Sequence, residues 1–440
     1  MAAKKTTKKA TSKPEPKAKA PRASSGATAE VLTRTEVPES SIGSDSDLRK
    51  KLREFSAQMN TERRVVAMAD EAPNVYELRR PTGIMQLDID IGGGFPAGGL
   101  SVVSGPDNAG KTYICLRAAF MHQRLYGQKS CIAFATAEGA FDYKRALASG
   151  IVLPIPDEMI REWNQERLNL GMPGYTDQDI LWFKRKVGEF TILRGHTGEE
   201  LMNVVLEAVK ANIFGLIIVD SFSVLLPEAD EEKDVGGIPK RAGNANLMTD
   251  FIKKYTPYTS GLHERNETSL IGIMQVRANA AKADAGHLAK YLKDWAVTGA
   301  YATRHGKLVD ITVWDGSPLK KTVQGQQVVY GKPFYWKIEK GKAGCHDNVQ
   351  GETEFRYDIP HGHDDIWSLI VNGTRRGIFV EENKKIQIYH PVTKTKTDLG
   401  GFPSFPAFGR VIAEDFEFEL QMRLYVLAAA GVQCLYRPLA

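Results

Sequence analysis

Short apolar runs alternate with longer amphipathic stretches from about residue 80 of the chain onward. The runs have the length of buried strands, and apolar residues recur at helical spacing between the first two of them. Continuous apolar runs separated by helices are typical of a parallel sheet that is covered by helices on both faces. The predicted strands are 100–104, 130–136, 190–193, 216–220 and 270–275, and Ile114, Ala118, Met121 and Leu125 share one face of the predicted helix.

The pattern changes after residue 300. Residues 308–314 and 327–339 are predicted to form two antiparallel strands, joined by a turn that contains glycine. Residues 361–440 are predicted to form a small α+β domain with a helix at 414–430. Residues 80–360 therefore form the predicted core, an α/β domain with a mostly parallel central sheet covered by helices.

The first 79 residues lack this alternation. Residues 1–45 are rich in Lys, Ala, Thr, Ser and Pro, and a segment so poor in large apolar side chains is predicted to be disordered. Residues 1–22 carry a charge of +7, which leaves −2 on the rest of a chain whose net charge is +5. Such a basic tail can bind nucleic acid without sequence preference, or it can simply keep the chain in solution. Residues 46–79 are predicted to be a helical lead-in, with Leu48, Leu52, Phe55 and Met59 at helical spacing.

The composition is that of an ordinary globular chain, with 42% hydrophobic and 25% charged residues among 440. No apolar run is long enough to span a bilayer, and the basic N-terminus lacks the apolar stretch of a secretory signal. The four cysteines are scattered without a CxxC pair, and Cys345 beside His346 is interpreted as an incidental loop dipeptide. These features predict no disulfide, no zinc site, no membrane partner and a reducing, cytoplasmic location.

Residues 105–112, here called the phosphate loop, read GPDNAGKT and fit the pattern GxxxxGK[ST]. Glycines let such a loop curl so that its N–H groups point at phosphate oxygens, and the following helix offers its positive end to the same anion. Lys111 would neutralise the β- and γ-phosphates, and the Thr112 hydroxyl would ligate Mg²⁺. The predicted nucleotide-binding residues of the loop are Gly105, Pro106, Asp107, Asn108, Ala109, Gly110, Lys111 and Thr112.

Two more of the predicted strands lead into a carboxylate. Asp220 ends the strand 216–220, and Glu138 follows the strand 130–136. The carboxyl ends of parallel strands form the ligand-binding edge of a sheet. One acid there can hold Mg²⁺ while the other orients and deprotonates the attacking water, and we predict Asp220 for the metal and Glu138 for the water. The simpler interpretation of Glu138 is a helix N-cap or a surface acid.

These elements, in this order, resemble the RecA family of DNA recombinases over about residues 80–380. The resemblance implies a RecA-type core of the P-loop NTPase class, DNA-dependent ATPase activity, and ATP and Mg²⁺ as cofactors. Taken singly, only the phosphate loop is a specific motif. The segments together, in this order, are strong evidence for the resemblance. The matching segments are TG at 82–83 with LD at 87–88 and GGG at 92–94, GPDNAGKT at 105–112, AEGAFD at 137–142, VDS at 219–221, IMQVR at 273–277 and IEKGK at 338–342.

The resemblance also implies roles for single residues. Glu138 would be the catalytic glutamate, acting beside Lys111, and Gln275 would sense the γ-phosphate. A neutral amide at the end of an apolar strand can donate a hydrogen bond to phosphate and pull on the next loop. An equally good interpretation is that the Gln275 amide only makes hydrogen bonds with its immediate neighbours. Lys340 and Lys342 would reach the ATP that a neighbouring subunit holds.

Asp142 and Tyr143 are implied as further nucleotide-binding residues. The family's adenine-stacking tyrosine has no clear counterpart, because Arg145 falls at its spacing and Tyr143 lies nearby.

Two loops are implied to line a path for single-stranded and double-stranded DNA. One lies near 231–242, and the other runs from Gln275 to about residue 299. Cations bind the backbone and aromatic side chains insert between bases, whereas the simpler interpretation of a charged loop is solvated surface. The implied DNA-binding residues are Lys240, Arg241, Arg277, Lys282 and Lys290.

The chain also departs from the family pattern. Residues 152–189, with Trp163, Trp182 and Lys184, are predicted to be an insertion. The second DNA loop and the C-terminal domain keep little of the usual sequence. These differences predict a divergent member of the family, of a kind that a phage genome could encode.

Three functions fit these observations. The first is a recombinase that assembles as a homo-oligomeric filament on single-stranded DNA for homologous pairing and strand exchange. The second is a ring-forming ATPase or helicase-type motor on the same fold, since fold does not fix function. The third is a recombination accessory protein without turnover, against which an intact Glu138 argues.

Overall fold

The chain separates into two compact units, Met1–Met59 and Asn60–Ala440. Within the first unit, helix α1 spans Asp47–Met59 and lies in the predicted helical lead-in. Among the described helices, none combines the length and apolar character needed to cross a bilayer. The computed structural model describes residues 47–59, 78–137, 139, 141–228, 243–259, 266–278, 295–297, 306–342, 344–345 and 347–436.

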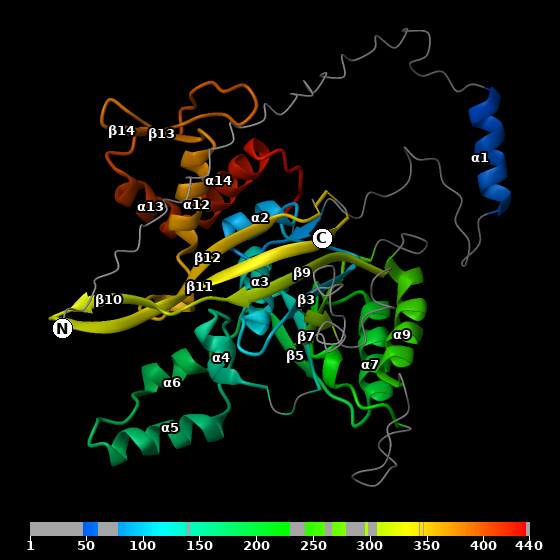
Figure 1. Ribbon diagram of the computed structural model, residues 1–440, viewed down its shortest axis with the longest axis horizontal. Helices are drawn as coiled ribbons and strands as arrows, with labels where there is room; N and C mark the ends of the chain where they lie inside the picture. Colours follow the sequence, from blue (N-terminus) through cyan, green and yellow to red (C-terminus); the bar gives the residue numbers. More distant parts are fainter. Residues whose placement is uncertain are drawn as a thin grey trace, which may run out of the picture. The chain divides into compact units, whose positions relative to one another are not determined.

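A ten-stranded sheet forms the centre of the second unit (Figure 1). Its middle strands run parallel in the order β9, β3, β7, β6, β4, β5. This arrangement confirms the predicted α/β class with a mostly parallel sheet. The bounds are Leu100–Gly105 for β3, Cys131–Thr136 for β4, Glu189–Leu193 for β5, Leu216–Asp220 for β6, Ser269–Ala278 for β7 and Lys307–Asp315 for β9.

An antiparallel extension continues the sheet beyond β9. Strand β11 (Gln326–Gly341) pairs with β9, and β10 (Leu319–Val323) and β12 (Gln350–Arg356) both pair with β11. The predicted antiparallel pairing is confirmed. The prediction of a single connecting turn is wrong, because β10 lies between β9 and β11 in the sequence. Most side chains of β10 are exposed, so no apolar alternation marks it in the sequence.

Helices cover both faces of the sheet. Helix α3 (Lys111–Tyr126) packs on one face, where Ile114 and Ala118 join an apolar cluster with Val103 and Ile218. Helices α7 (Gly198–Ala211) and α9 (Gly243–Thr259) pack on the other face, against the alternate strand residues Val102 and Ile217. The predicted buried face of α3 is confirmed, since Ile114, Ala118 and Met121 are all fully buried.

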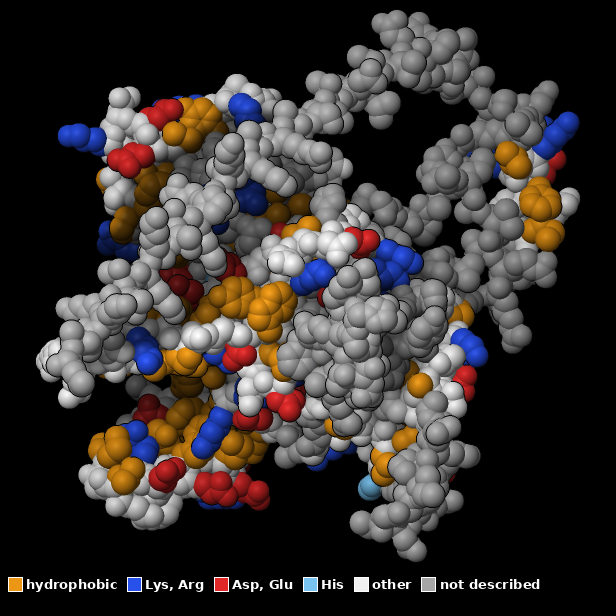
Figure 2. All heavy atoms as spheres, in the orientation of Figure 1, with side chains coloured by type: hydrophobic (Ala, Val, Ile, Leu, Met, Phe, Trp, Pro, Cys, Tyr) orange, Lys and Arg blue, Asp and Glu red, His pale blue; other side chains and the backbone are white. Residues whose placement is uncertain are grey.

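The segment 152–189 forms a helical pair between α4 (Tyr143–Ala148) and β5. Helix α5 spans Asp157–Asn169, and helix α6 spans Asp177–Phe183. The ring of Phe183 holds the pair together, because it packs edge-on against Trp163 and Tyr175. Apolar side chains gather on the outside of this pair, at the lower left of Figure 2. The large exposed apolar residues are Leu168, Leu170, Met172, Ile180, Leu181 and Trp182.

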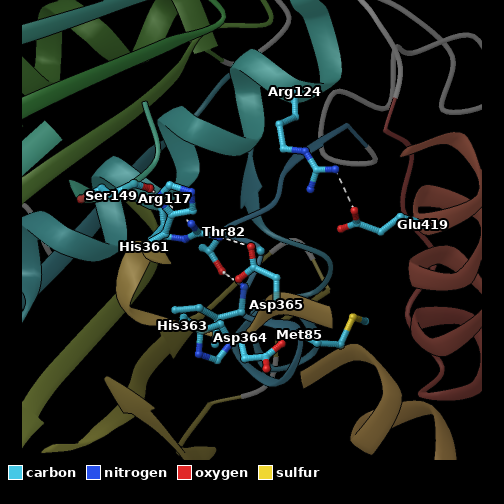
Figure 3. Close-up of polar contacts among 12 residues, drawn as sticks. Thr82, Met85, Arg117, Arg124, Ser149, His361, His363, Asp364, Asp365 and Glu419 are labelled. Atoms are coloured by element: carbon cyan, nitrogen blue, oxygen red, sulfur yellow. Dashed lines mark hydrogen bonds and ion pairs between the residues drawn. The ribbon is translucent and has the colours of Figure 1, made fainter. Parts of the chain in front are cut away.

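The C-terminal part combines helices with a small hairpin around a third apolar cluster. Buried charges join this part to α3 (Figure 3). Arg117 of α3 forms an ion pair with Asp365, and Arg124 of α3 lies 2.8 Å from Glu419. The elements are α12 (Asp365–Arg375), β13 (Phe379–Glu382), β14 (Lys385–Ile388), α13 (Phe405–Glu414) and α14 (Phe416–Ala429).

Asp88 of α2 (Met85–Asp90) is fully buried beside these charges. Its carboxylate accepts hydrogen bonds from the Thr82 N–H at 2.7 Å, the Thr82 hydroxyl at 2.8 Å and the Gly83 N–H at 3.1 Å. Burial raises the pKa of Asp88 to about 7, against these bonds and the Arg423 guanidinium, which lower it. Arg423 of α14 donates to the Gly83 carbonyl at 3.2 Å, so the same turn is held from both sides.

Replacing Asp88 by Asn should change how stability depends on pH. The pKa of Asp88 in the folded chain lies above its value of about 4 in the unfolded chain, so the folded state binds more protons between the two values. The free energy of unfolding should therefore fall by up to about 4 kcal/mol as pH rises from 4 to 7. Urea denaturation at several pH values should show this decline for the unmodified chain and a weaker one for Asp88→Asn. Equal slopes for the two proteins would contradict the prediction.

Candidate functional site

The phosphate loop connects β3 to α3 and curls through two residues with positive φ. Asn108 has φ of 59°, and Gly110, which caps α3, has φ of 84°. A side chain on Gly110 would be strained by this backbone and would also lie 2.8 Å from the ring of Phe334. Glycine at this position therefore lets the loop turn directly into the first residue of the helix.

Gly105, the last residue of β3, is required for a different reason. A Cβ atom at this position would lie 2.4 Å from the Val313 carbonyl oxygen of β9. Because that neighbour is backbone, it cannot move aside as a flexible side chain would. The two glycines of the motif thus allow the loop to pass close to the adjacent strand and to begin the helix.

Lys111 and Thr112 open helix α3 and make polar contacts within the site. The Lys111 ammonium donates to the Pro106 carbonyl inside the loop at 2.6 Å. The Thr112 hydroxyl donates to the Asp220 carboxylate at 2.9 Å. The fold thus brings together the hydroxyl of the loop and the acid at the end of β6, which are 108 residues apart. Oxygen ligands paired in this way suit a Mg²⁺ ion that also binds phosphate.

Strand register aligns the other predicted residues along the same edge. Thr136 of β4 lies opposite Asp220 of β6, and Gly105 of β3 lies opposite Gln275 of β7. The Ala137 N–H donates to the Asp220 carbonyl at 2.9 Å. Glu138, the predicted catalytic residue, lies outside the described residues, so its role stays a prediction.

Gln275 lies inside β7 and not at its end, so that part of the prediction is wrong. The strand continues to Ala278 because Val276, Arg277 and Ala278 pair with β8 (Trp295–Val297). The Gln275 N–H donates to the Ser223 hydroxyl at 2.7 Å. Ser223 lies in the short 3₁₀ turn that follows Asp220. This hydrogen bond therefore links the end of β6, which carries Asp220, to β7, which carries Gln275.

Asp142 and Tyr143 lie where the chain enters α4. The Asp142 side chain caps this helix by accepting from the Arg145 N–H at 3.0 Å. The Tyr143 ring packs edge-on against Phe141 with 5.1 Å between ring centres. These contacts fix both residues locally, and nucleotide contact by either one stays a prediction.

Lys340 and Lys342 lie away from the edge of the sheet that carries their own phosphate loop. Lys340 lies opposite Asp310 in the register of β11 and β9, and the Lys342 N–H donates to the Leu308 carbonyl at 2.8 Å. Lys340 is level with Val102, which lies three strand residues, or roughly 10 Å, from Gly105, and Lys342 lies further along the strand. Partial burial, followed by the neighbouring Lys342 and Lys307, lowers the pKa of Lys340.

Most of the predicted DNA-binding residues are not placed. Lys240, Arg241, Lys282 and Lys290 lie outside the described residues, and Arg277 is described only by its backbone in β7. Their contact with DNA therefore stays a prediction.

A lysine beside the phosphate loop was not anticipated from the sequence. Lys332 of β11 donates to the Asn108 carbonyl at 2.9 Å and pairs with Asp315 at 2.7 Å. No local motif marks it, since its position depends on how β9 and β11 pair beside the loop. In the part of the chain described here, no group of three or more His, Cys, Asp or Glu side chains could hold a metal ion.

The chain is similar to bacterial RecA proteins. Protein RecA of Desulfovibrio desulfuricans is 30% identical over 198 residues, which are 45% of this chain and 44% of that protein. Protein RecA of Bacteroides thetaiotaomicron is 25% identical over 280 residues, with 63% and 68% covered, and that of Petrotoga mobilis is 26% identical over 264 residues, with 60% and 57% covered. The chain thus spans about half to two thirds of the length of these relatives. No family model matches it.

Replacing Ser223 by Ala should destabilise the edge that carries the site. The partly buried Gln275 N–H would lose its acceptor, and we expect the free energy of unfolding to fall by about 1–2 kcal/mol. Urea denaturation measures this loss, and Ser223→Thr should recover most of it because it keeps the hydroxyl. The exposed Ser317→Ala is a matched control that should leave stability unchanged. A Ser223→Ala variant as stable as the control would contradict the prediction.

Proposed function

Because this chain is a divergent member of the RecA family, we propose that it is an ATP-hydrolysing recombinase that assembles on single-stranded DNA in the cytoplasm. The observation that carries the proposal is the hydrogen bond between Thr112 and Asp220 at the head of α3. It joins the phosphate loop to a strand-end acid in the arrangement that nucleotide hydrolysis requires.

Each residue of the site has a separate role in nucleotide binding and hydrolysis. The backbone N–H groups of residues 105–112 and the positive end of α3 bind the phosphates, and Lys111 neutralises their charge. Thr112 and Asp220 would hold Mg²⁺, which supplies charge to the phosphate oxygens when bound. Glu138 orients the attacking water and accepts its proton. Gln275 passes the nucleotide state to the DNA-binding loop through the strand that Ser223 fixes.

A second copy of the chain completes this site. Lys340 and Lys342 lie too far along the sheet to reach the phosphate loop of their own subunit, as the register of β3, β9 and β11 implies. In a head-to-tail assembly they would meet the nucleotide of the next subunit and stabilise the developing phosphate charge. Such an interface repeats along a filament, which suits a protein that coats single-stranded DNA and pairs it with a homologous duplex.

ATP hydrolysis should be stimulated by single-stranded DNA. Steady-state turnover with Mg²⁺, measured with and without DNA, should rise severalfold when DNA is added.

Glu138→Gln should reduce turnover by at least about a hundredfold and keep nucleotide binding, because only the acceptor of the water proton is lost. Lys111→Ala should lose both, since the phosphate charge is no longer neutralised. Equal turnover with and without DNA would argue against the recombinase, and closed rings in electron micrographs would favour the motor.

Mixing two inactive variants should restore activity if the site is shared between subunits. Lys111→Ala disables the phosphate loop, and the double variant Lys340→Ala, Lys342→Ala disables the lysines that face the neighbour. In an equal mixture about a quarter of the interfaces join an intact loop to an intact lysine pair, so roughly a quarter of the turnover should return. The control is each variant alone at the same total concentration. A mixture no more active than its components would show that the lysines do not act across the interface.

A further inference from the structure

Strand β11 passes beside the phosphate loop and touches it with two residues of one face. Lys332 and Phe334 are two positions apart, so their side chains point to the same side of the strand. The Lys332 ammonium donates to the Asn108 carbonyl at 2.9 Å, and the Phe334 ring closes the space beside Gly110. One strand more than 200 residues further along the chain therefore supports both the tip of the loop and the residue that caps α3.

A second partner fixes the Lys332 ammonium in place. Asp315, the last residue of β9, lies 2.7 Å from it, and the side chain of Lys332 is only 20% exposed. The backbones that carry the two side chains are fixed as well, because Asp315 lies opposite Phe334 in the β9–β11 ladder. The ammonium is thus held between a carboxylate and a carbonyl of the phosphate loop.

The contact sets the direction of one peptide group in the loop. In a trans peptide the C=O and the following N–H point in opposite directions, so turning the Asn108 carbonyl toward Lys332 turns the Ala109 N–H away from it. That N–H points into the loop, where it lies 3.4 Å from the Pro106 carbonyl, the same oxygen that accepts from Lys111. The Ala109 N–H and the Lys111 ammonium therefore converge on one point inside the loop, where an anion can replace the carbonyl.

The contact also stabilises an unfavourable backbone conformation. Asn108 has φ of 59°, in the left-handed region that non-glycine residues rarely adopt. A hydrogen bond from a charged donor to its carbonyl offsets part of this cost. Without it, the exposed tip of the loop would sample other conformations in which the Ala109 N–H no longer faces the phosphate.

From these contacts we propose that Lys332 is a positioning residue of the nucleotide site. Its ammonium, held by Asp315, keeps the Asn108 carbonyl outward and so prepares the Ala109 N–H and Lys111 to bind phosphate. The inference rests on the proposed function, since it names a further residue of the same ATP site. It concerns binding of the phosphates, which ATP and ADP share, and leaves hydrolysis itself to the residues described above.

The test compares nucleotide affinity with turnover in two Lys332 variants. Lys332→Met keeps the stem of the side chain and removes the ammonium, and we expect ATP and ADP to bind about five- to tenfold more weakly. KM for ATP should rise by a similar factor, while kcat should stay within about twofold. Lys332→Arg, which keeps the charge and donors, should recover most of the affinity. Titration with a fluorescent ATP analogue, in the absence of DNA, gives the affinities, and steady-state assays give KM and kcat.

Lys321→Met is the matched control. Lys321 of β10 also pairs with a carboxylate, that of Asp358 at 2.9 Å, but its partner is not part of the phosphate loop. This variant should bind nucleotide as the unmodified chain does. A Lys332→Met variant with unchanged affinity, or with a loss in kcat alone, would overturn the inference while nucleotide binding by the unmodified chain stands. Failure of the unmodified chain to bind ATP would overturn the proposed function and this inference together.

Discussion

The hydrogen bond between Thr112 and Asp220 is the interaction on which the site depends. It requires the loop after β3, the start of α3 and the end of β6 to meet at one point. That meeting depends in turn on the parallel register of β3, β7, β6 and β4, which brings their carboxyl ends to a common edge. The apolar clusters on both faces of the sheet fix this register, because a shift of one residue would turn buried side chains such as Val102 and Val103 to the wrong face.

Much of this arrangement could be predicted from the sequence because it is encoded locally. The apolar runs correspond closely to β3, β4, β5 and β6, and the spacing of Ile114 and Ala118 marks the buried face of α3. The phosphate loop is a contiguous motif between a strand and a helix, so its placement follows from its neighbours. Asp220 could be assigned to the same edge because it ends an apolar run in a parallel sheet.

Other features depend on contacts between distant segments and left no local signal. Strand β10 is mostly exposed, so its residues lack the alternation that marks a half-buried strand. The continuation of β7 past Gln275 depends on pairing with β8. Lys332 resembles any other polar strand residue until β11 is paired with β9, because only then does its ammonium meet Asn108. Asp88 likewise becomes a buried acid through packing, and its sequence neighbours do not foretell its raised pKa.

The buried charges between α3 and the C-terminal part bear on how this chain can evolve. Arg117 of α3 is fully buried and Arg124 of α3 is 25% exposed, and each has its acidic partner in the C-terminal part. Removing one partner of a buried ion pair costs several kcal/mol, because the remaining charge is left without compensation in a poorly solvated place. The helix that begins at the phosphate loop has thus become dependent on the segment after residue 360. That segment is no interchangeable module, and descendants of this chain can lose or exchange it only if Arg117 and Arg124 change at the same time.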